Sequence, residues 1–322
     1  PLHLSEVFHA QPALRWPEST FAHLHPDPLP HMTEPAPVKA SKPSTEELQR
    51  IASQVRRDIV RMVHACQSGH PGGSLGCADF FTALYFSVMK HDPAHFDMNG
   101  AGQDLFFLSN GHISPVFYSV LAHSGYFPAS ELKTFRRLDS RLQGHPTTHE
   151  GLPGVRMASG SLGQGLSVGI GAALAKKLNQ DPQLVYTLHG DGELQEGQIW
   201  EAAMFAAANK VDNLIATVDQ NGRQIDGDTD QVLPLGDLHA KWTAFGWDVL
   251  TMNGNDMVAV LQGLAEAKKR TGRGKPVCIL MRTEMGMGVD FMMGSHEWHG
   301  IAPNDEQLAK ALAQLPETLG DY

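Results

Sequence analysis

The chain has 322 residues, of which 42% are hydrophobic, and this is enough to bury one large core or two small ones. Its 25 basic and 35 acidic residues give a net charge of −10, which disfavours a nucleic-acid partner because phosphate backbones are bound by clustered Lys and Arg. Three scattered cysteines exclude a disulfide framework or a thiolate zinc site, and no apolar run reaches the roughly 18 residues of a membrane span, so we expect a cytoplasmic protein outside the membrane.

The first ordered element is predicted to begin at Ser44. Residues 1–43 are rich in Pro and His without a sustained period, and we interpret them as an irregular tail that is either natural or in part vector-derived, since His31-Met32 is a second candidate start. Ser44 and Glu47 then form a capping box, and apolar residues recur at helical spacing from Leu48 to Val63. A folded domain is therefore expected over residues 44–322.

Five short apolar runs alternate with helical patterns along this domain. The runs cover residues 105–108, 184–188, 214–218, 247–252 and 277–281, and helices are predicted around residues 77–90, 114–124, 162–178, 197–209, 235–245, 256–270 and 305–314. This alternation predicts an α/β fold with a doubly wound, mostly parallel sheet and helices on both faces. Such sheets bind ligands beyond the carboxyl ends of their strands, so the residues directly after each run are the candidates for chemistry.

Two oxygen-bearing side chains follow successive predicted strands. Asp191 lies between Gly190 and Gly192 after one strand, and Asn221 follows the next strand along the chain. A carboxylate and an amide oxygen suit a hard cation such as Mg²⁺, and flanking glycines let the backbone approach a diphosphate. Each segment alone is a common turn or hairpin tip. As a pair at the ends of two strands, they favour a site for a metal and a diphosphate.

The segment from Gly190 to Gly197, closed by Asn221, resembles the thiamine diphosphate-binding motif of transketolases. Other segments with family-like spacing resemble further transketolase signatures, namely residues 68–73, 109–112, 144–146, 160–165 and 294–300. The resemblance extends from about residue 45 to residue 322 and implies the thiamine diphosphate-binding fold.

The resemblance also implies how the cofactor is held. Asp191, Asn221 and the main-chain carbonyl of Arg223 would bind the divalent cation, which is Mg²⁺ or in its place Ca²⁺ or Mn²⁺. The residues implied to bind thiamine diphosphate are Gly160, Leu162, Gly190, Asp191, Gly192, Glu193, Asn221 and His112. The stretch from Gly160 to Gly165 would open a helix whose free N–H groups face the diphosphate or the aminopyrimidine, whereas close helix packing is the other explanation for such glycines.

The catalytic residues implied by the resemblance are His70, His112, His145 and His296, which would line the substrate channel, and Glu196, which would join a carboxylate network across a dimer interface. Glu201 is a weaker member of that network, and Arg136 resembles an arginine at the substrate entrance. Taken from the residues alone, a loop histidine is usually only solvated, and acids or arginines at helix ends are common.

In transketolases, a glutamate on a following domain activates the cofactor, and we identify no segment for that glutamate here. We therefore expect the N-terminal subunit of a split transketolase, active with a C-terminal partner subunit in a heterotetramer that contains two copies of each chain. It would move a two-carbon ketol unit from a ketose to an aldose, as sugars or sugar phosphates, in pentose phosphate metabolism. The alternatives are a donor that is a non-standard sugar or an oxo acid, and a non-catalytic protein that binds thiamine diphosphate.

Overall fold

The computed structural model describes residues 42–322, so the predicted tail lies almost entirely outside the described residues. The first helix, α1 (Thr45–Cys66), begins where the sequence predicts. The Ser44 side chain accepts a hydrogen bond from the Glu47 N–H at 3.2 Å, and the Glu47 carboxylate accepts one from the Ser44 N–H at 2.6 Å. The capping box therefore closes the helix start through both groups.

All five predicted strands are present, and they form one parallel sheet in the order β1-β2-β3-β7-β6. The strands are β1 (Leu105–Leu108), β2 (Val185–Gly190), β3 (Leu214–Gln220), β6 (Asp248–Asn253) and β7 (Val277–Arg282). A short antiparallel hairpin of β4 (Arg223–Gln224) and β5 (Gly227–Asp228) follows β3. The predicted α/β class is confirmed, and the carboxyl ends of β1, β2 and β3 meet at one edge of the sheet.

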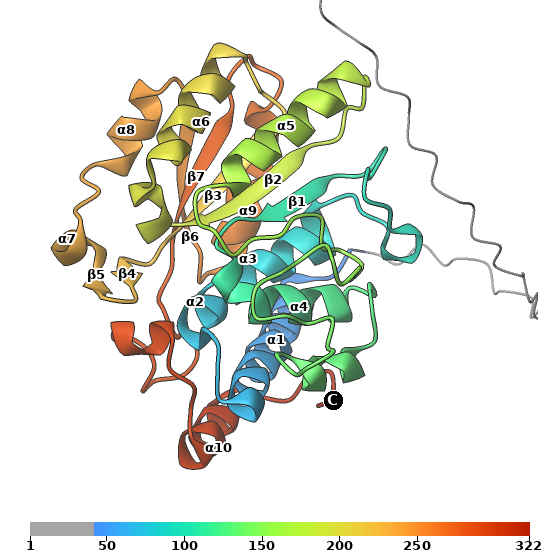
Figure 1. Ribbon diagram of the computed structural model, residues 1–322, viewed down its shortest axis with the longest axis vertical. Coiled ribbons are helices and arrows are strands. Elements are labelled where there is room, and N and C mark those ends of the chain that lie inside the picture. The colour runs from blue at the N-terminus through green and yellow to red at the C-terminus, as the bar shows by residue number, and fades with distance from the viewer. Residues whose placement is uncertain (1–41) are drawn as a thin grey trace, which may run out of the picture. The chain divides into compact units, whose positions relative to one another are not determined.

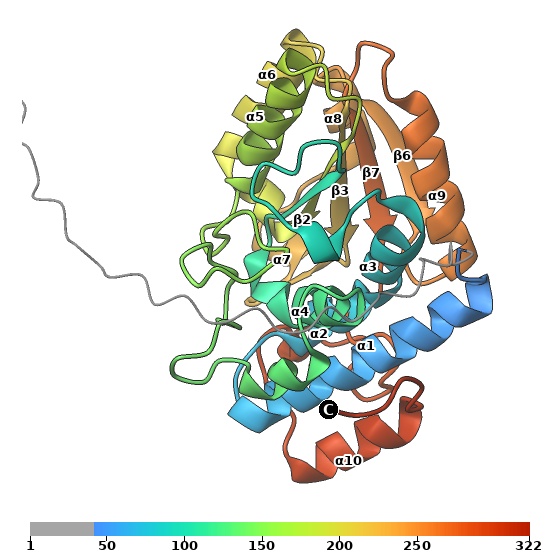
Figure 2. The same ribbon diagram turned by 90° about the vertical axis from the view of Figure 1, so that its right-hand side faces the viewer.

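Helices cover both faces of this sheet (Figures 1 and 2). One face carries α5 (Gly165–Leu178), α6 (Gly197–Ala208) and α8 (Leu238–Ala244), while the other carries α1, α3 (Ala78–Ala83), α4 (Ser114–His123) and α9 (Met257–Arg270). The helix α10 (Asp305–Gln314) packs on α1. The sequence pattern did not predict the short helices α2 (Pro71–Gly76) and α7 (Thr229–Val232). Within residues 42–322, no helix is both long and apolar enough to cross a membrane.

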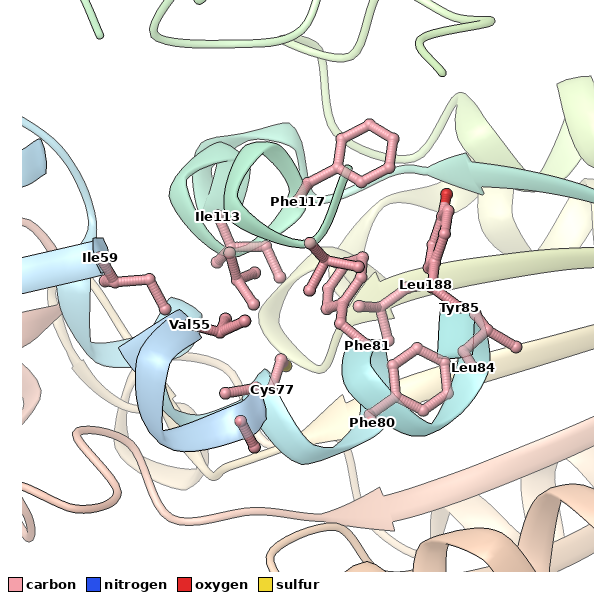
Figure 3. Close-up of a cluster of buried hydrophobic side chains, with 14 of the residues drawn as sticks. Val55, Ile59, Cys77, Phe80, Phe81, Leu84, Tyr85, Ile113, Phe117 and Leu188 are labelled. Atoms are coloured by element: carbon pink, nitrogen blue, oxygen red, sulfur yellow. The ribbon is translucent and has the colours of Figure 1, made fainter. Parts of the chain in front are cut away.

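The strands are apolar on both sides because each side faces a layer of helices. Phe106 and Leu188 belong to the core beneath α1, α3 and α4, and Figure 3 shows Leu188 in one buried cluster with Phe81 and Phe117. Phe107 and Val185 belong to the core beneath α5, α6 and α8. The sheet is therefore held from both faces, and its loop-bearing edge is left to form a site.

Two glycines let the loops at this edge approach each other. A Cβ atom on Gly111 would lie 1.5 Å from the Ser159 carbonyl oxygen, and one on Gly165 would lie 2.3 Å from the Ser109 Cβ atom. Both distances are far shorter than carbon–carbon or carbon–oxygen contacts allow. The loop after β1 is therefore seated directly against the loop that precedes α5.

Candidate functional site

A cavity of about 380 Å³ opens at the carboxyl ends of β1, β2 and β3, a volume within the usual range of ligand pockets. The predicted site residues that line it are His70, His112, His145, Gly160, Leu162, Gly190, Asp191, Gly192, Glu193, Glu196, Asn221 and Arg223. A larger and more open hollow of about 690 Å³ lies at the ends of β6 and β7, but its lining includes no histidine and no buried carboxylate. The smaller cavity is therefore the candidate active site.

The structure places His299, rather than the predicted His296, on the cavity wall. Both residues belong to one 3₁₀ turn, His296–His299, and its last residue reaches the cavity. The His299 ring centroid lies 5.0 Å from that of His112 and 5.5 Å from that of His70. Residues three apart in a 3₁₀ turn lie on the same side of the turn, separated by a rise of about 2 Å per residue. The sequence pattern does not show which of His296 and His299 lies nearer the cavity.

Four histidines thus surround one part of the cavity, and the pKa values of all four are lowered. Burial, followed by the neighbouring His299, Arg136 and His145, lowers the pKa of His70 to about 4. Burial, followed by His299 and His70, lowers the pKa of His112 well below its ordinary value. The Nδ1 atoms of His70 and His299 are buried without a hydrogen-bond partner in the protein. At neutral pH these rings can therefore donate and accept hydrogen bonds to a ligand as neutral imidazoles.

This burial predicts a specific pH dependence for the chain without cofactor. Because the pKa of His70 is about 4 in the folded protein against an ordinary 6.5, the unfolded chain binds more protons between these values. The contribution of His70 to the unfolding free energy is constant above pH 6.5. It decreases as the pH falls from 6.5 to about 4. Relative to His70→Asn, the wild type should lose at most about 1.4 kcal/mol of unfolding free energy per pH unit.

Denaturant titrations of both proteins at several pH values between 4.5 and 7.5 measure this difference. His239→Asn is the control, because His239 is exposed on α8 and should track the wild type at each pH. If the unfolding free energies of the wild type and His70→Asn change in parallel with pH over the whole range, the lowered pKa of the half-buried His70 is contradicted.

Asp191 joins the turns that follow β2 and β3. It is only 2% exposed, and its two carboxylate oxygens accept hydrogen bonds from the N–H groups of Gly192 at 2.7 Å and Gly222 at 2.6 Å. Burial, followed by the nearby Asp219, raises the pKa of Asp191 to about 7. A cation beside this carboxylate would stabilise its charged form, as the predicted metal site requires.

The amide of Asn221 is oriented by its neighbours. Its Nδ2 atom donates to the Asp219 carboxylate at 2.8 Å, while its Oδ1 atom accepts from the Arg223 N–H at 2.9 Å and keeps a second lone pair. Asp219 is itself buried and was not among the predicted site residues. The signal that could have found it is its place two residues before Asn221 at the end of the same strand.

The donor set in the cavity fits a hard cation with an anionic ligand. No group of three or more His, Cys, Asp or Glu side chains in residues 42–322 is arranged to hold a metal ion. A cation here would therefore need amide, carbonyl and ligand oxygens in addition to Asp191, which is the oxygen environment that Mg²⁺ prefers. The buried Oδ1 atom of Asn110, on the same cavity wall, also lacks a partner in the protein. These open positions fit the predicted cofactor.

The start of α5 differs from the prediction. The helix begins at Gly165 rather than near residue 162. The N–H of Gly163 donates to the Glu193 carboxylate at 2.7 Å, and the N–H of Gly165 donates to Ser109 Oγ at 3.0 Å. These two N–H groups are therefore bound within the protein and do not face a diphosphate. Gly160 and Leu162 line the cavity ahead of the helix.

Arg136 is neither exposed at a helix end nor part of the cavity wall. Its backbone is left-handed, with φ of 56°, and its Nη1 and Nη2 atoms donate to Ser68 Oγ at 2.9 Å and to the Gly144 carbonyl at 3.4 Å. These two partners lie in the loops that carry His70 and His145. Arg136 therefore links the loop that carries His70 to the loop that carries His145.

The two predicted acids of the interface network lie apart. Glu196 is exposed and lines the cavity, whereas Glu201 lines a separate groove of about 410 Å³ between α5 and α6. Neither carboxylate has a hydrogen-bond partner within residues 42–322 that would hold it in place. Their exposure leaves them available to another chain.

Comparison with known proteins connects this site to one family. A family model described as the transketolase thiamine diphosphate binding domain matches residues 47–317. The chain is 38% identical over 275 residues to an apulose-4-phosphate transketolase subunit of Actinobacillus succinogenes, covering 85% of this chain and 98% of that protein. It is 39% identical over 269 residues to the 6-deoxy-6-sulfo-D-fructose transketolase subunit SqwG of a Clostridium species, covering 84% and 96%. The crystal structure of Campylobacter jejuni transketolase matches with a TM-score of 0.77 and 36% identity over 83% of this chain but only 42% of that one.

Proposed function

The chain belongs to the transketolase family, and from that membership we propose that it is the thiamine diphosphate-binding chain of a two-chain transketolase. Its activity would be the transfer of a two-carbon ketol unit from a ketose or ketose phosphate to an aldose or aldose phosphate. The observation that carries the proposal is that Asp191 and Asn221 share one cavity with His70, His112 and His145. A site that only held a metal and a diphosphate would have no use for these imidazoles, whereas sugar hydroxyls and developing oxyanions need such donors and acceptors.

The cofactor would be held by its charged end. The side-chain oxygens of Asp191 and Asn221 and the main-chain carbonyl of Arg223 would bind the divalent cation, Mg²⁺ or in its place Ca²⁺ or Mn²⁺. Gly190 and Gly192 would let the backbone approach the diphosphate. When bound, thiamine diphosphate supplies the nucleophilic carbon and the electron sink that making and breaking a carbon–carbon bond require. The cavity histidines would hold the oxygens of the sugar.

A second polypeptide would complete the site. The relative from Actinobacillus succinogenes is aligned over 98% of its own length, whereas the Campylobacter jejuni transketolase has a chain of which this protein spans only 42%. We assign the functions of the remaining part, including the activating glutamate, to a C-terminal subunit. Two copies of each chain would form a heterotetramer.

The face formed by α5 and α6 supports this arrangement. Val168, Met204 and Phe205 are 39%, 54% and 50% exposed on these helices, and Phe205 lines the groove that contains Glu201. Both helices begin beside the cavity, since Leu162 precedes α5 and Glu196 precedes α6. Exposed apolar patches of this kind mark protein interfaces. We assign this face to the C-terminal subunit, with Glu196 and Glu201 directed at it.

The donor would be a sugar. The two relatives named as transketolase subunits are 38% and 39% identical to this chain, yet their names give different sugars, apulose 4-phosphate and 6-deoxy-6-sulfo-D-fructose. Overall identity therefore does not select among ketose phosphates, sulfonated ketoses and other non-standard sugars. A panel of these donors, with an oxo acid as the competing class, identifies the substrate. A non-catalytic role would leave the buried, unpartnered imidazole nitrogens without a purpose.

The test is reconstitution from purified chains. With thiamine diphosphate and Mg²⁺, this chain alone should transfer no two-carbon unit, because we assign the activating glutamate to the C-terminal subunit. Adding the C-terminal transketolase chain of the same organism should raise the rate by at least about 1,000-fold, since enzymes commonly accelerate reactions by far more.

Transfer by the chain alone at an ordinary enzymatic rate, about 1 s⁻¹ or faster, would overturn the two-chain proposal. A mixed complex that binds the cofactor but moves no two-carbon unit from any donor in the panel would favour the non-catalytic alternative.

A further inference from the structure

Glu193 is a buried acid at the centre of the loops that form the cavity. It was predicted from the family resemblance to bind the cofactor, and it does line the cavity. We propose instead that Glu193 is a positioning residue, which acts on the cofactor through the loops that it joins. This inference rests on the proposed function, because it concerns the same cofactor site.

Three hydrogen bonds tie the Glu193 carboxylate to three different segments. Its Oε1 atom accepts from Ser109 Oγ in the loop after β1 and from the Gly163 N–H at 2.7 Å in the loop before α5. Its Oε2 atom accepts from the Gly190 N–H at 3.1 Å at the end of β2. The side chain is only 2% exposed. One carboxylate therefore sets the spacing between the three segments.

Ser109 extends this network by one step. While its hydroxyl donates to Glu193, its Oγ atom accepts from the Gly165 N–H at 3.0 Å. The first residue of α5 and the loop before it are thus held by the Glu193–Ser109 pair. That loop includes Gly160 and Leu162, the two cavity residues predicted to contact the cofactor.

Packing also restrains the loop before α5. Gly163 has a left-handed backbone with φ of +85°, and a Cβ atom placed there would lie 2.8 Å from the Gln198 side chain and 3.0 Å from that of Glu196. The loop is therefore packed against the start of α6 on one side and bonded to Glu193 on the other. Losing the Glu193 bond would release one of these two restraints.

The charge of Glu193 also argues against direct contact with a diphosphate. A bare carboxylate against that anion would be repelled. Here the charge is met by protein donors, and His189 lies behind it with Nδ1 3.6 Å from Oε1, a close contact that is too long for a hydrogen bond. His189 is fully buried, and its Nε2 atom pairs with Thr187 Oγ1 at 2.8 Å. The carboxylate is therefore directed into the protein.

Glu193→Gln tests this role. The amide keeps the size of the side chain, but only its oxygen can accept, so its NH₂ group must face one of the three donors. At least one loop should lose its bond and shift. In the reconstituted two-chain enzyme, the dissociation constant for thiamine diphosphate should rise by roughly 10- to 100-fold, the range found when groups that orient metal ligands are removed. The kcat at saturating cofactor should change by less than about threefold, since no group at the substrate is removed.

Asp104→Asn is a matched control. Asp104 is also buried, and its carboxylate accepts two main-chain N–H groups, those of Leu184 at 2.8 Å and Lys90 at 2.9 Å. It lies at the opposite edge of the sheet, directly before β1. Its replacement should lower thermal stability as Glu193→Gln does, while the cofactor dissociation constant stays within about twofold of the wild type. Ser109→Ala removes the bond from Ser109 to Glu193 and the bond from the Gly165 N–H to Ser109. It should raise the cofactor dissociation constant in the same direction as Glu193→Gln.

Cofactor binding is measured by calorimetry and turnover by a transfer assay on the same preparations. Glu193→Gln that alters cofactor affinity no more than Asp104→Asn would overturn the proposal, as would a fall in kcat at saturating cofactor with unchanged affinity. If Glu193→Gln does not fold, Ser109→Ala decides by the same criterion. A wild-type pair that binds the cofactor without transferring a two-carbon unit would refute the proposed function but leave the comparison of affinities valid.

Discussion

Asp191→Ala is expected to abolish cofactor binding that depends on a divalent cation. Asp191 is the only carboxylate among the proposed metal ligands, and it is buried where its charge is poorly solvated. Removing one partner of a buried charge pair costs about 3–5 kcal/mol, because the other charge is left uncompensated. The affinity for thiamine diphosphate in the presence of Mg²⁺ should therefore fall roughly 100- to 4,000-fold, and transfer should fall with it.

Calorimetric titration of the reconstituted enzyme with the cofactor, at several Mg²⁺ concentrations, measures this loss. The wild type should bind more tightly as Mg²⁺ increases, and Asp191→Ala should show no such dependence. Asp230→Ala is the control, since Asp230 is an exposed acid on α7 and its loss should change affinity by no more than about twofold. Unchanged affinity and unchanged Mg²⁺ dependence in Asp191→Ala would show that this carboxylate is not a ligand.

His112→Asn is expected to lower turnover while largely sparing cofactor affinity. The half-buried His112 ring lines the cavity, and its centroid lies 5.1 Å from that of His70 and 5.0 Å from that of His299. Its neutral imidazole can donate and accept a proton at the substrate oxygens, whereas an amide can do so only weakly. Groups in such roles commonly contribute 10²- to 10⁴-fold, so kcat should fall by at least about 100-fold.

A transfer assay at saturating cofactor gives kcat, and calorimetry gives the cofactor dissociation constant, which should change by less than about tenfold. His239→Asn is the control, because it removes an exposed imidazole of α8 that is not part of the cavity lining. A large loss of cofactor affinity with little change in kcat would move His112 from the substrate to the cofactor, the second role that the family resemblance implies for it.

Much of the fold could be predicted from the sequence because the relevant signals are local. The capping box at Ser44 and the apolar runs of the five strands depend on residues a few positions apart, and the structure has each of them where the pattern predicts. The order of the strands in the sheet could not be predicted in this way. β7 lies between β3 and β6, and this placement depends on packing between distant segments. No local pattern contains that information.

The site likewise contains some features that could be predicted from the sequence and others that could not. Asp191 and Asn221 could be paired from the sequence because each follows a strand, and parallel strands bring their carboxyl ends to one edge. The choice of His299 over His296, the bracing of two loops by Arg136 and the use of Glu193 by three segments required the tertiary structure. Each depends on the direction of a side chain relative to residues far away in the sequence. The residue types at the edge of the sheet can therefore be predicted from local patterns, whereas packing between distant segments directs each side chain towards the cavity or into its walls.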